Sequence, residues 1–194
     1  MLLLFIGLAI FLLTHLLPTA PDLRNGLTER FGTKTYRILF SSFSLVGFIL
    51  IVLGYHKIQI HTGKNVFLWE SPEWLHIITW LLMWPAMIFL VAAYVPSRIR
   101  TTLKHPMLAA VKVWALSHLI VNGDVASLLL FGSFLGYAIY DRISIAHRET
   151  SKSKVAPSAS PYGDILVLVV GSLAYIFMLF VGHAWFIGVP LLNT

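Results

Sequence analysis

The histidines are the residues of this apolar sequence that could take part in the widest range of chemistry, because several of them lie inside or beside long apolar stretches. His118 and His183 lie in ALSHLIV and FVGHAWF, and His15 and His76 lie near the ends of two further apolar runs. Neutral imidazoles bind iron and zinc well. The chain has no cysteine, which excludes thiolate-held iron–sulfur clusters and covalently attached c-type haem. Any metal centre must therefore use histidine.

One stretch, HPMLAAVKVWALSHLIVNGD, concentrates polar groups in an otherwise apolar segment. Hydrocarbon penalises such groups, so ionisable residues inside a membrane segment indicate function by default. Besides His118, the stretch carries His105, Lys112, Trp114, Asn122 and Asp124. Lys112 is open to two interpretations, snorkelling to the lipid headgroups or pairing with a buried partner. We expect His105, directly before Pro106, to cap a helix entrance. Asn122 and Asp124 are expected to shape a turn, with Asp124 as the N-cap of the next helix.

The composition is that of a membrane protein. Of 194 residues, 58% are hydrophobic and 11% are charged, whereas ~25% of the residues in a soluble domain are charged. The apolar runs follow one another closely, so we expect residues 1–194 to form a single transmembrane domain within the lipid bilayer. The net charge of +6 comes from basic residues in the connections between runs, and no basic face carries interleaved aromatic residues. Nucleic acid is therefore not an expected partner.

The predicted fold class is all-α, a polytopic membrane bundle of about six helices. The apolar runs approach the ~20 residues that cross ~30 Å of hydrocarbon, and they are residues 2–17, 38–55, 74–95, 106–121, 125–140 and 165–189. Only residues 122–124 join the fourth and fifth runs, which predicts an antiparallel helical hairpin. Gly132 and Gly136 form a G-x-x-x-G pair that lets another helix approach. Residues 141–160 are charged and then rich in Ser, Ala and Pro, which predicts a flexible loop.

The basic residues predict the topology. Lysine and arginine gather in the first, third and fifth connections, which by the positive-inside rule places both termini outside. No basic residue precedes the first run, unlike the charge order of a signal peptide, so this run is expected to remain as a helix. His76, His118 and His183 then lie near the outer surface, where they could meet. His15 and His105 lie at the inner level, with His105 ~20 Å from His118 along one helix.

Two histidines at one depth between helices can hold a haem, because facing imidazoles ligate the iron while aromatic rings pack the macrocycle. The aromatic candidates are Trp80, Trp84, Trp114 and Phe131. Zinc usually needs three protein ligands. His76, His118 and His183 suffice in number, but no H-E-x-x-H motif accompanies them. The sequence shows no paired carboxylates, Ser/His/Asp grouping or phosphate loop, so hydrolysis has little support.

The polar stretch, followed by LLLFGSFLGYAIYDR, resembles the signature of the NnrU family of bacterial membrane proteins. HLLPTAPDLRNGL and YRILFSSFSLVG resemble the N-terminal part of that family, so the resemblance covers most of the chain. It implies a multi-pass protein of the bacterial inner membrane, linked to nitrite and nitric oxide reduction in denitrification. The family is similar in turn to the zeta-carotene isomerase of plants and cyanobacteria, a haem b protein whose histidine-held iron isomerises a cis double bond in a polyene.

The resemblance also implies site residues. The positions that match are His105 with Pro106, Trp114, His118 and Asn122. His118 is the best candidate for the haem ligand. The resemblance implies His15 as its partner, whereas the predicted depths favour His76 or His183.

Three functional hypotheses follow. The first is a haem b protein in nitrogen-oxide redox metabolism, or an isomerase-like enzyme that acts on a polyene. The second is a non-enzymatic accessory protein that helps to assemble or regulate a respiratory reductase. The third is a small transporter, suggested by Lys112 and by a kink at Pro85, although no repeat or paired half-helices support it.

Overall fold

The computed structural model describes residues 1–61, 63, 65–149, 160 and 162–192. Helices account for 83% of these residues, which confirms the predicted all-α fold class. The chain divides into two compact units, Met1–Lys64 and Asn65–Thr194. Each unit is described by itself below.

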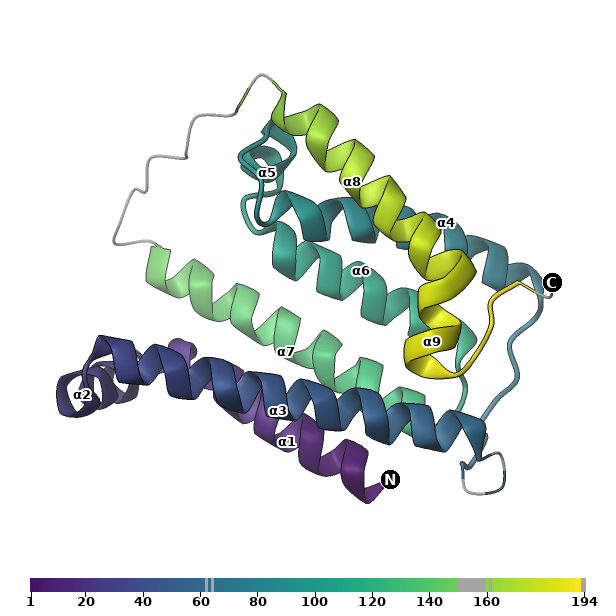
Figure 1. The fold of residues 1–194 in the computed structure, drawn as a ribbon, viewed down its shortest axis with the longest axis horizontal. Coiled ribbons are helices and arrows are strands. Elements are labelled where there is room, and N and C mark those ends of the chain that lie inside the picture. The colour runs from purple at the N-terminus through teal and green to yellow at the C-terminus, as the bar shows by residue number, and fades with distance from the viewer. Residues whose placement is uncertain (62, 64, 150–159, 161, 193–194) are drawn as a thin grey trace. The chain divides into compact units, whose positions relative to one another are not determined.

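The first unit consists of two long helices and one short helix (Figure 1). Helix α1 is Leu2–Leu16, α2 is Pro21–Phe31 and α3 is Thr33–Ile60. Helices α1 and α3 pack side by side along their length, because glycines let the two backbones come close. A Cβ at Gly54 would lie 2.5 Å from the backbone nitrogen of Leu4, and a Cβ at Gly7 would lie 2.7 Å from that of Ile51. Neither glycine has room for a side chain.

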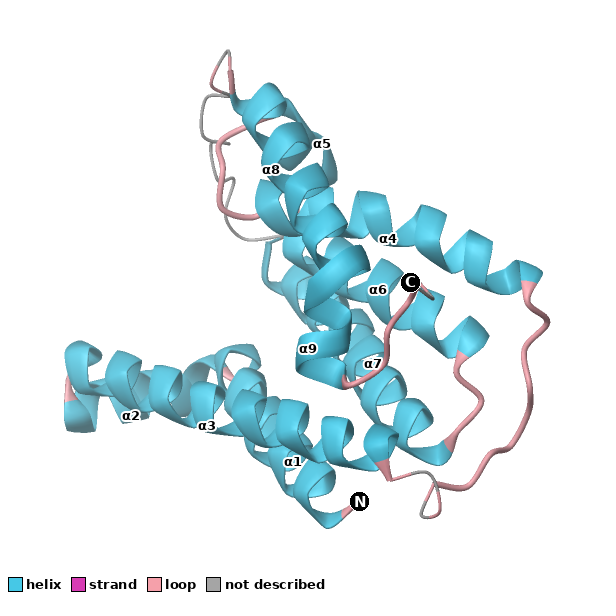
Figure 2. Cartoon of the chain, turned by 45° about the vertical axis from the view of Figure 1, so that its right-hand side comes forward, coloured by secondary structure: helices cyan, strands magenta, loops and turns pink. Residues whose placement is uncertain are grey.

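The second unit is built around α4, which packs against both α6 and α8 (Figure 2). Its helices are α4 Trp74–Ala92, α5 Arg98–Leu103, α6 Pro106–Val121, α7 Val125–Glu149, α8 Gly163–Phe177 and α9 His183–Ile187. Gly171 of α8 lies directly on Ile88 of α4, where an added Cβ would stand 2.8 Å from the Ile88 Cα. On the other side of α4, the Thr79 hydroxyl donates to the Ser117 carbonyl of α6 at 3.0 Å. Helix α7 packs against α6.

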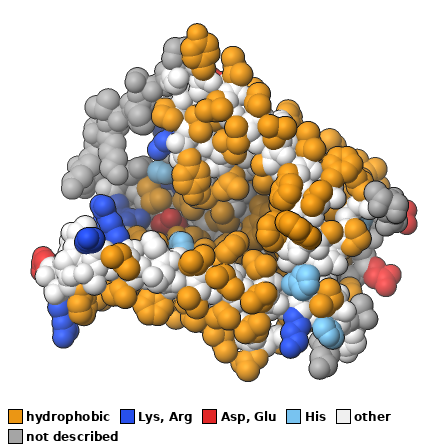
Figure 3. Space-filling view, in the orientation of Figure 1, with side chains coloured by type: hydrophobic (Ala, Val, Ile, Leu, Met, Phe, Trp, Pro, Cys, Tyr) orange, Lys and Arg blue, Asp and Glu red, His pale blue; other side chains and the backbone are white. Residues whose placement is uncertain are grey.

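Most of these helices have the length and composition of membrane spans. Within the described residues, five apolar helical segments are long enough to cross a bilayer: Leu2–Thr19, Thr33–Ile60, Trp74–Ala92, Val125–Arg148 and Gly163–Ile187. Large apolar side chains lie exposed on them, including Leu81 at 69% and Ile165 at 62% (Figure 3). Such faces are stable only against lipid or another apolar surface. Helix α6 is apolar but shorter, and it is sheltered by α4 and α7.

Comparison with the predicted runs shows where composition misleads. The run 106–121 coincides with α6, and 2–17 and 74–95 differ little from α1 and α4. Helix α3 is longer than the predicted 38–55, since polar residues at both ends continue the helix. Helix α7 extends to Glu149, so a loop is wrong for residues 141–149, where i to i+4 bonding continues despite the charges. The remainder of the predicted loop, apart from residue 160, falls largely outside the described residues.

Two short helices and one glycine pair add to this comparison. Helices α2 and α5 lie in basic connections and have no counterpart among the predicted helices. Among the described residues of the second unit no helix packs on the G-x-x-x-G pair of α7, since a Cβ at Gly132 would meet only Leu128 of its own helix, at 4.0 Å. The G-x-x-x-G pattern is therefore not a helix contact within this unit.

The glycine contacts of the first unit predict a position-specific loss of stability. Gly54→Ala should lower the free energy of unfolding by about 1–3 kcal/mol, because its methyl group would overlap the Leu4 backbone. Gly136→Ala is the matched control in an apolar helix, since nothing lies within 4 Å of its Cβ position. Thermal unfolding in detergent, followed by circular dichroism, measures both. Equal stability of Gly54→Ala and wild type would contradict the packing of α1 on α3.

Candidate functional site

Two imidazoles face each other in the second unit. His118 in the last turn of α6 and His183 at the start of α9 have ring centroids 6.5 Å apart, and their planes differ by only 14°. Both side chains are partly buried. The structure therefore brings together two of the three histidines that the predicted topology places at one depth.

Backbone carbonyls define which nitrogen of each ring carries a proton. The His118 Nδ1 lies 2.8 Å from the Trp114 carbonyl oxygen, and the His183 Nδ1 lies 2.7 Å from the Val189 carbonyl oxygen. A carbonyl only accepts hydrogen bonds, so each Nδ1 must donate. In the neutral imidazole the Nε2 then keeps its lone pair. Each ring thus has a nitrogen free of its proton, as a metal ligand requires.

Aromatic rings surround His118. Phe131 of α7 stacks on the imidazole, with centroids 4.5 Å apart and an angle of 23° between the planes. Trp114, one turn earlier on α6, lies 5.7 Å from the imidazole and meets Phe131 edge-on at 5.0 Å. Phe134 contacts Trp114 from the next turn of α7, at 5.4 Å. These contacts hold the His118 ring in a rigid, apolar setting.

The backbone is irregular both before and after His183 in the chain, and this irregularity fixes the position of the His183 side chain. The segment Met178–Gly182 between α8 and α9 is π-helical, a form that often marks functional positions. After α9, Gly188 adopts a φ of 84°, a conformation that side chains disfavour, and its amide donates to the Ala184 carbonyl at 2.9 Å. The chain turns back here. Val189 consequently presents its carbonyl to the His183 ring six residues upstream.

A buried carboxylate fixes the hairpin that carries His118. Asp124 is only 4% exposed, and its Oδ1 accepts from the Ser127 amide at 2.8 Å, which confirms its predicted role as the N-cap of α7. The same oxygen accepts from the Asn65 amide group at 2.7 Å, and Oδ2 accepts from the Ser127 hydroxyl at 2.5 Å. Asn122 donates to the His118 carbonyl at 2.9 Å and ends α6. Asn122 and Asp124 therefore act in the hairpin, as the turn prediction requires.

The segment before α4 closes over this hairpin. The amides of Leu68 and Trp69 both donate to the Gly123 carbonyl, at 2.6 and 3.3 Å. Trp69 lies so close to Gly123 that a side chain at position 123 would collide with the Trp69 carbonyl. The Ser71 hydroxyl adds a bond of 3.0 Å to the Val121 carbonyl. The sequence patterns did not identify these partners, because they depend on residues fifty or more positions apart.

The other candidate residues lie elsewhere. His76 is exposed on α4, and its Nε2 lies 3.4 Å from the Ser71 hydroxyl. Among the described residues no three His, Cys, Asp or Glu side chains gather as a metal site, so a zinc triad with His118 and His183 does not form. His15 belongs to the first unit, where its Nδ1 lies 2.8 Å from the Phe11 carbonyl oxygen and its ring stacks on Phe11.

Two further polar residues of α6 complete this account. His105 occupies the N-cap position of α6, as predicted, although its side chain makes no cap hydrogen bond. Its backbone carbonyl accepts from the Ala109 amide at 3.1 Å, and Pro106 fills the first helical position, where a missing N–H costs nothing. Lys112 is partly buried, and no ion pair or hydrogen bond joins its ammonium group to another residue that the structure describes.

Fold and site together define a class, a multi-pass helical membrane protein with two facing imidazoles near one end of its second unit. The family model described as NnrU protein matches residues 3–191, nearly the whole chain. The chain belongs to the NnrU family, which confirms the resemblance drawn from the sequence. The match spans both units. No curated protein and no solved structure matches the chain.

The carboxylate of Asp124 should carry a measurable share of the stability. Asp124→Ala removes the N-cap of α7 and leaves the Asn65 amide without its acceptor, so we expect a loss of roughly 1–3 kcal/mol. Glu73→Ala is the matched control, because Glu73 occupies the N-cap position of α4 without a capping side-chain bond. Thermal unfolding in detergent should separate the two variants. Equal melting temperatures for both would contradict the hairpin role of Asp124.

Proposed function

We propose that this NnrU-family protein binds haem b through His118 and His183 and acts in nitrogen-oxide redox metabolism at the bacterial inner membrane. The observation that carries the proposal is the pair of nearly parallel imidazoles with both Nδ1 atoms donating to carbonyls. The location and the link to nitrite and nitric oxide reduction come from the family resemblance.

The donor set fits the group. His118 and His183 would hold the iron, since their ring centroids lie 6.5 Å apart and neither Nε2 carries a proton in the tautomer that the carbonyls fix. The chain has no cysteine, so imidazole is the strongest iron ligand it offers. The apolar rings of Trp114 and Phe131 beside His118 also suit a macrocycle, which is held largely by apolar contact.

The chain's own residues would then orient and tune the ligands. The carbonyls of Trp114 and Val189 fix both tautomers, and a donating Nδ1 raises the basicity of Nε2. Haem held in this way supplies one-electron redox chemistry. The Trp114 and Phe131 rings beside His118 would lower the local dielectric constant around the group.

Haem binding can be tested on the purified protein. Reduced-minus-oxidised spectra in detergent should show a b-type band for wild type, and His118→Ala or His183→Ala should each lose most of it. His76→Ala is the matched control, since His76 lies on α4 and contacts Ser71. His15→Ala tests the partner that the resemblance implies. Added imidazole should partly restore the band in His118→Ala if the protein is folded.

Several outcomes would contradict the proposal. A well-folded wild-type protein without a b-type band after reconstitution with haemin would exclude the cofactor. A band that persists in His183→Ala but vanishes in His15→Ala would move the second ligand to the first unit. If cells regain nitrite reduction with a variant that lacks both His118 and His183, the protein is instead a non-enzymatic accessory factor for a reductase.

A further inference from the structure

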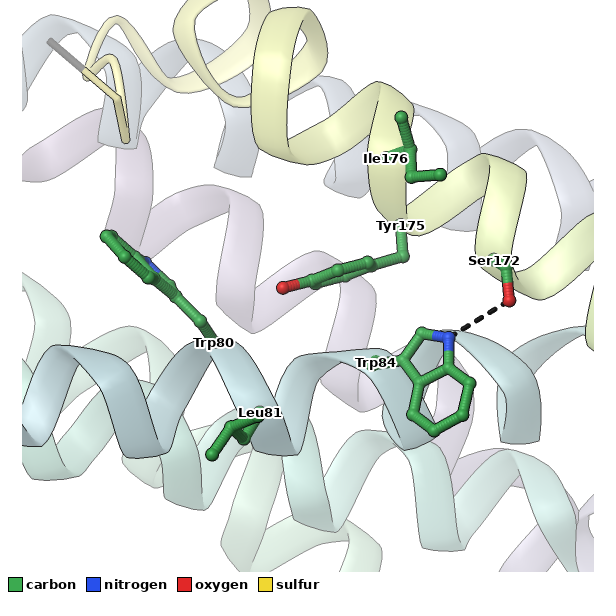
Figure 4. A pocket seen from close by; sticks show the side chains of 6 residues that line it. All are labelled: Trp80, Leu81, Trp84, Ser172, Tyr175 and Ile176. Carbon is green, nitrogen blue, oxygen red and sulfur yellow. Dashed lines mark hydrogen bonds between the residues drawn. The ribbon is translucent and has the colours of Figure 1, made fainter.

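A second feature of the same unit is a pocket between α4 and α8 that the imidazole pair does not use (Figure 4). Its volume is about 390 Å³, enough for a ring system with short substituents. The lining residues are Trp80, Leu81, Trp84, Ser172, Tyr175 and Ile176. Leu81 and Ile176 are 69% and 49% exposed, so the pocket opens on the apolar side of the helices. An occupant would enter from the lipid phase.

Two of the polar atoms in the pocket are already paired. The Trp84 indole N–H donates to the Ser172 hydroxyl at 3.0 Å, which ties α4 to α8 and holds the Trp84 ring in place. The Tyr175 hydroxyl points across the pocket toward the Trp80 ring (Figure 4). Within the described part of the chain, no hydrogen bond joins this hydroxyl to another residue. The pocket therefore offers the Tyr175 hydroxyl as a donor between aromatic rings.

The depth of the pocket makes that donor significant. Trp80 lies six residues into α4, which is ~9 Å along the axis from its first residue, Trp74. At this depth a bilayer supplies little water, so a polar group without a partner carries a free-energy cost. A ligand that brings an oxygen acceptor to Tyr175 would remove this cost. A saturated acyl chain has no such atom along its length.

The pocket also lies at the level of the imidazole pair. The Thr79 hydroxyl donates to the Ser117 carbonyl, and Trp80 and His118 are the next residues on their helices. The backbones of Trp80 and His118 are consequently neighbours across the contact between α4 and α6. A molecule in the pocket would share the depth of the facing imidazoles.

We propose that this pocket binds a lipid-soluble planar carbonyl compound of the quinone class. The indole and phenol rings of Trp80 and Tyr175 offer flat faces for a conjugated ring, which stacks better on them than a flexible chain does. The Tyr175 hydroxyl donates to one ring carbonyl, and the side chain of the ligand leaves through the open apolar side past Leu81. This binding site goes beyond the proposed haem function and does not depend on it.

The test uses the full-length protein in phosphatidylcholine nanodiscs, with decylubiquinone as the probe. We expect saturable retention of the quinone by wild type, and a three- to tenfold weaker Kd for Tyr175→Phe, which loses only the hydroxyl. Tyr162→Phe is the matched control, because Tyr162 lies at the start of the same helix, is 76% exposed and does not line the pocket. Trp80→Leu should weaken retention further, since it removes the stacking face.

Competition identifies the class of ligand. Excess palmitate or decylbenzene should fail to displace decylubiquinone, because neither molecule carries a ring carbonyl for Tyr175. Displacement by palmitate at equal concentration would identify a lipid acyl site and overturn the proposal. Preferential displacement by an oxygen-free polyene would overturn it as well. Retention that rises linearly with quinone, or that is unchanged in Tyr175→Phe, would show partition into the bilayer only.

Discussion

The arrangement of the second unit depends on one buried carboxylate, that of Asp124. It accepts three hydrogen bonds, from the Asn65 amide group and from the amide and hydroxyl of Ser127, and so satisfies a charge that apolar surroundings would otherwise expel. Because these bonds fix the first turn of α7, they also fix Phe131, two turns later. Phe131 in turn stacks on His118 of α6. A structural carboxylate thus sets the position of a ligand-type side chain that it does not touch.

His183 is placed by backbone geometry rather than by side-chain packing. A π-helical segment precedes it, and the turn at Gly188 follows it. The two features bring the Val189 carbonyl to the His183 Nδ1, just as the Trp114 carbonyl meets the His118 Nδ1. Both rings are thereby held in the same tautomer. Because backbone carbonyls hold both imidazoles in the same tautomer, the pair supports a shared role more strongly than a short distance alone would.

Polar groups are few in this unit, and the presence of an intramolecular partner distinguishes those with a structural role from those proposed to bind a ligand. Asp124, Asn122 and Thr79 have all found intramolecular partners, so their roles are structural. The haem proposal rests on the Nε2 atoms of the imidazole pair, and the quinone proposal rests on the hydroxyl of Tyr175. All three lie beside aromatic rings on helices with apolar outer faces. A membrane protein that places donors and ligands in this way is suited to an apolar, conjugated occupant.

The sequence by itself determined the membrane character, the bounds of the short α6 and the Asp124 cap, because hydrophobic runs, prolines and capping residues act locally. It also showed the NnrU relationship and singled out His118. The charged residues at 141–149 led to the wrong prediction of a loop, since they belong to helix α7. The tertiary structure alone decided that His183, rather than His76, faces His118, and that Tyr175 meets Trp80 across a pocket. These pairings rest on a π-helical segment and on packing between helices far apart in the chain, and no local pattern encodes either.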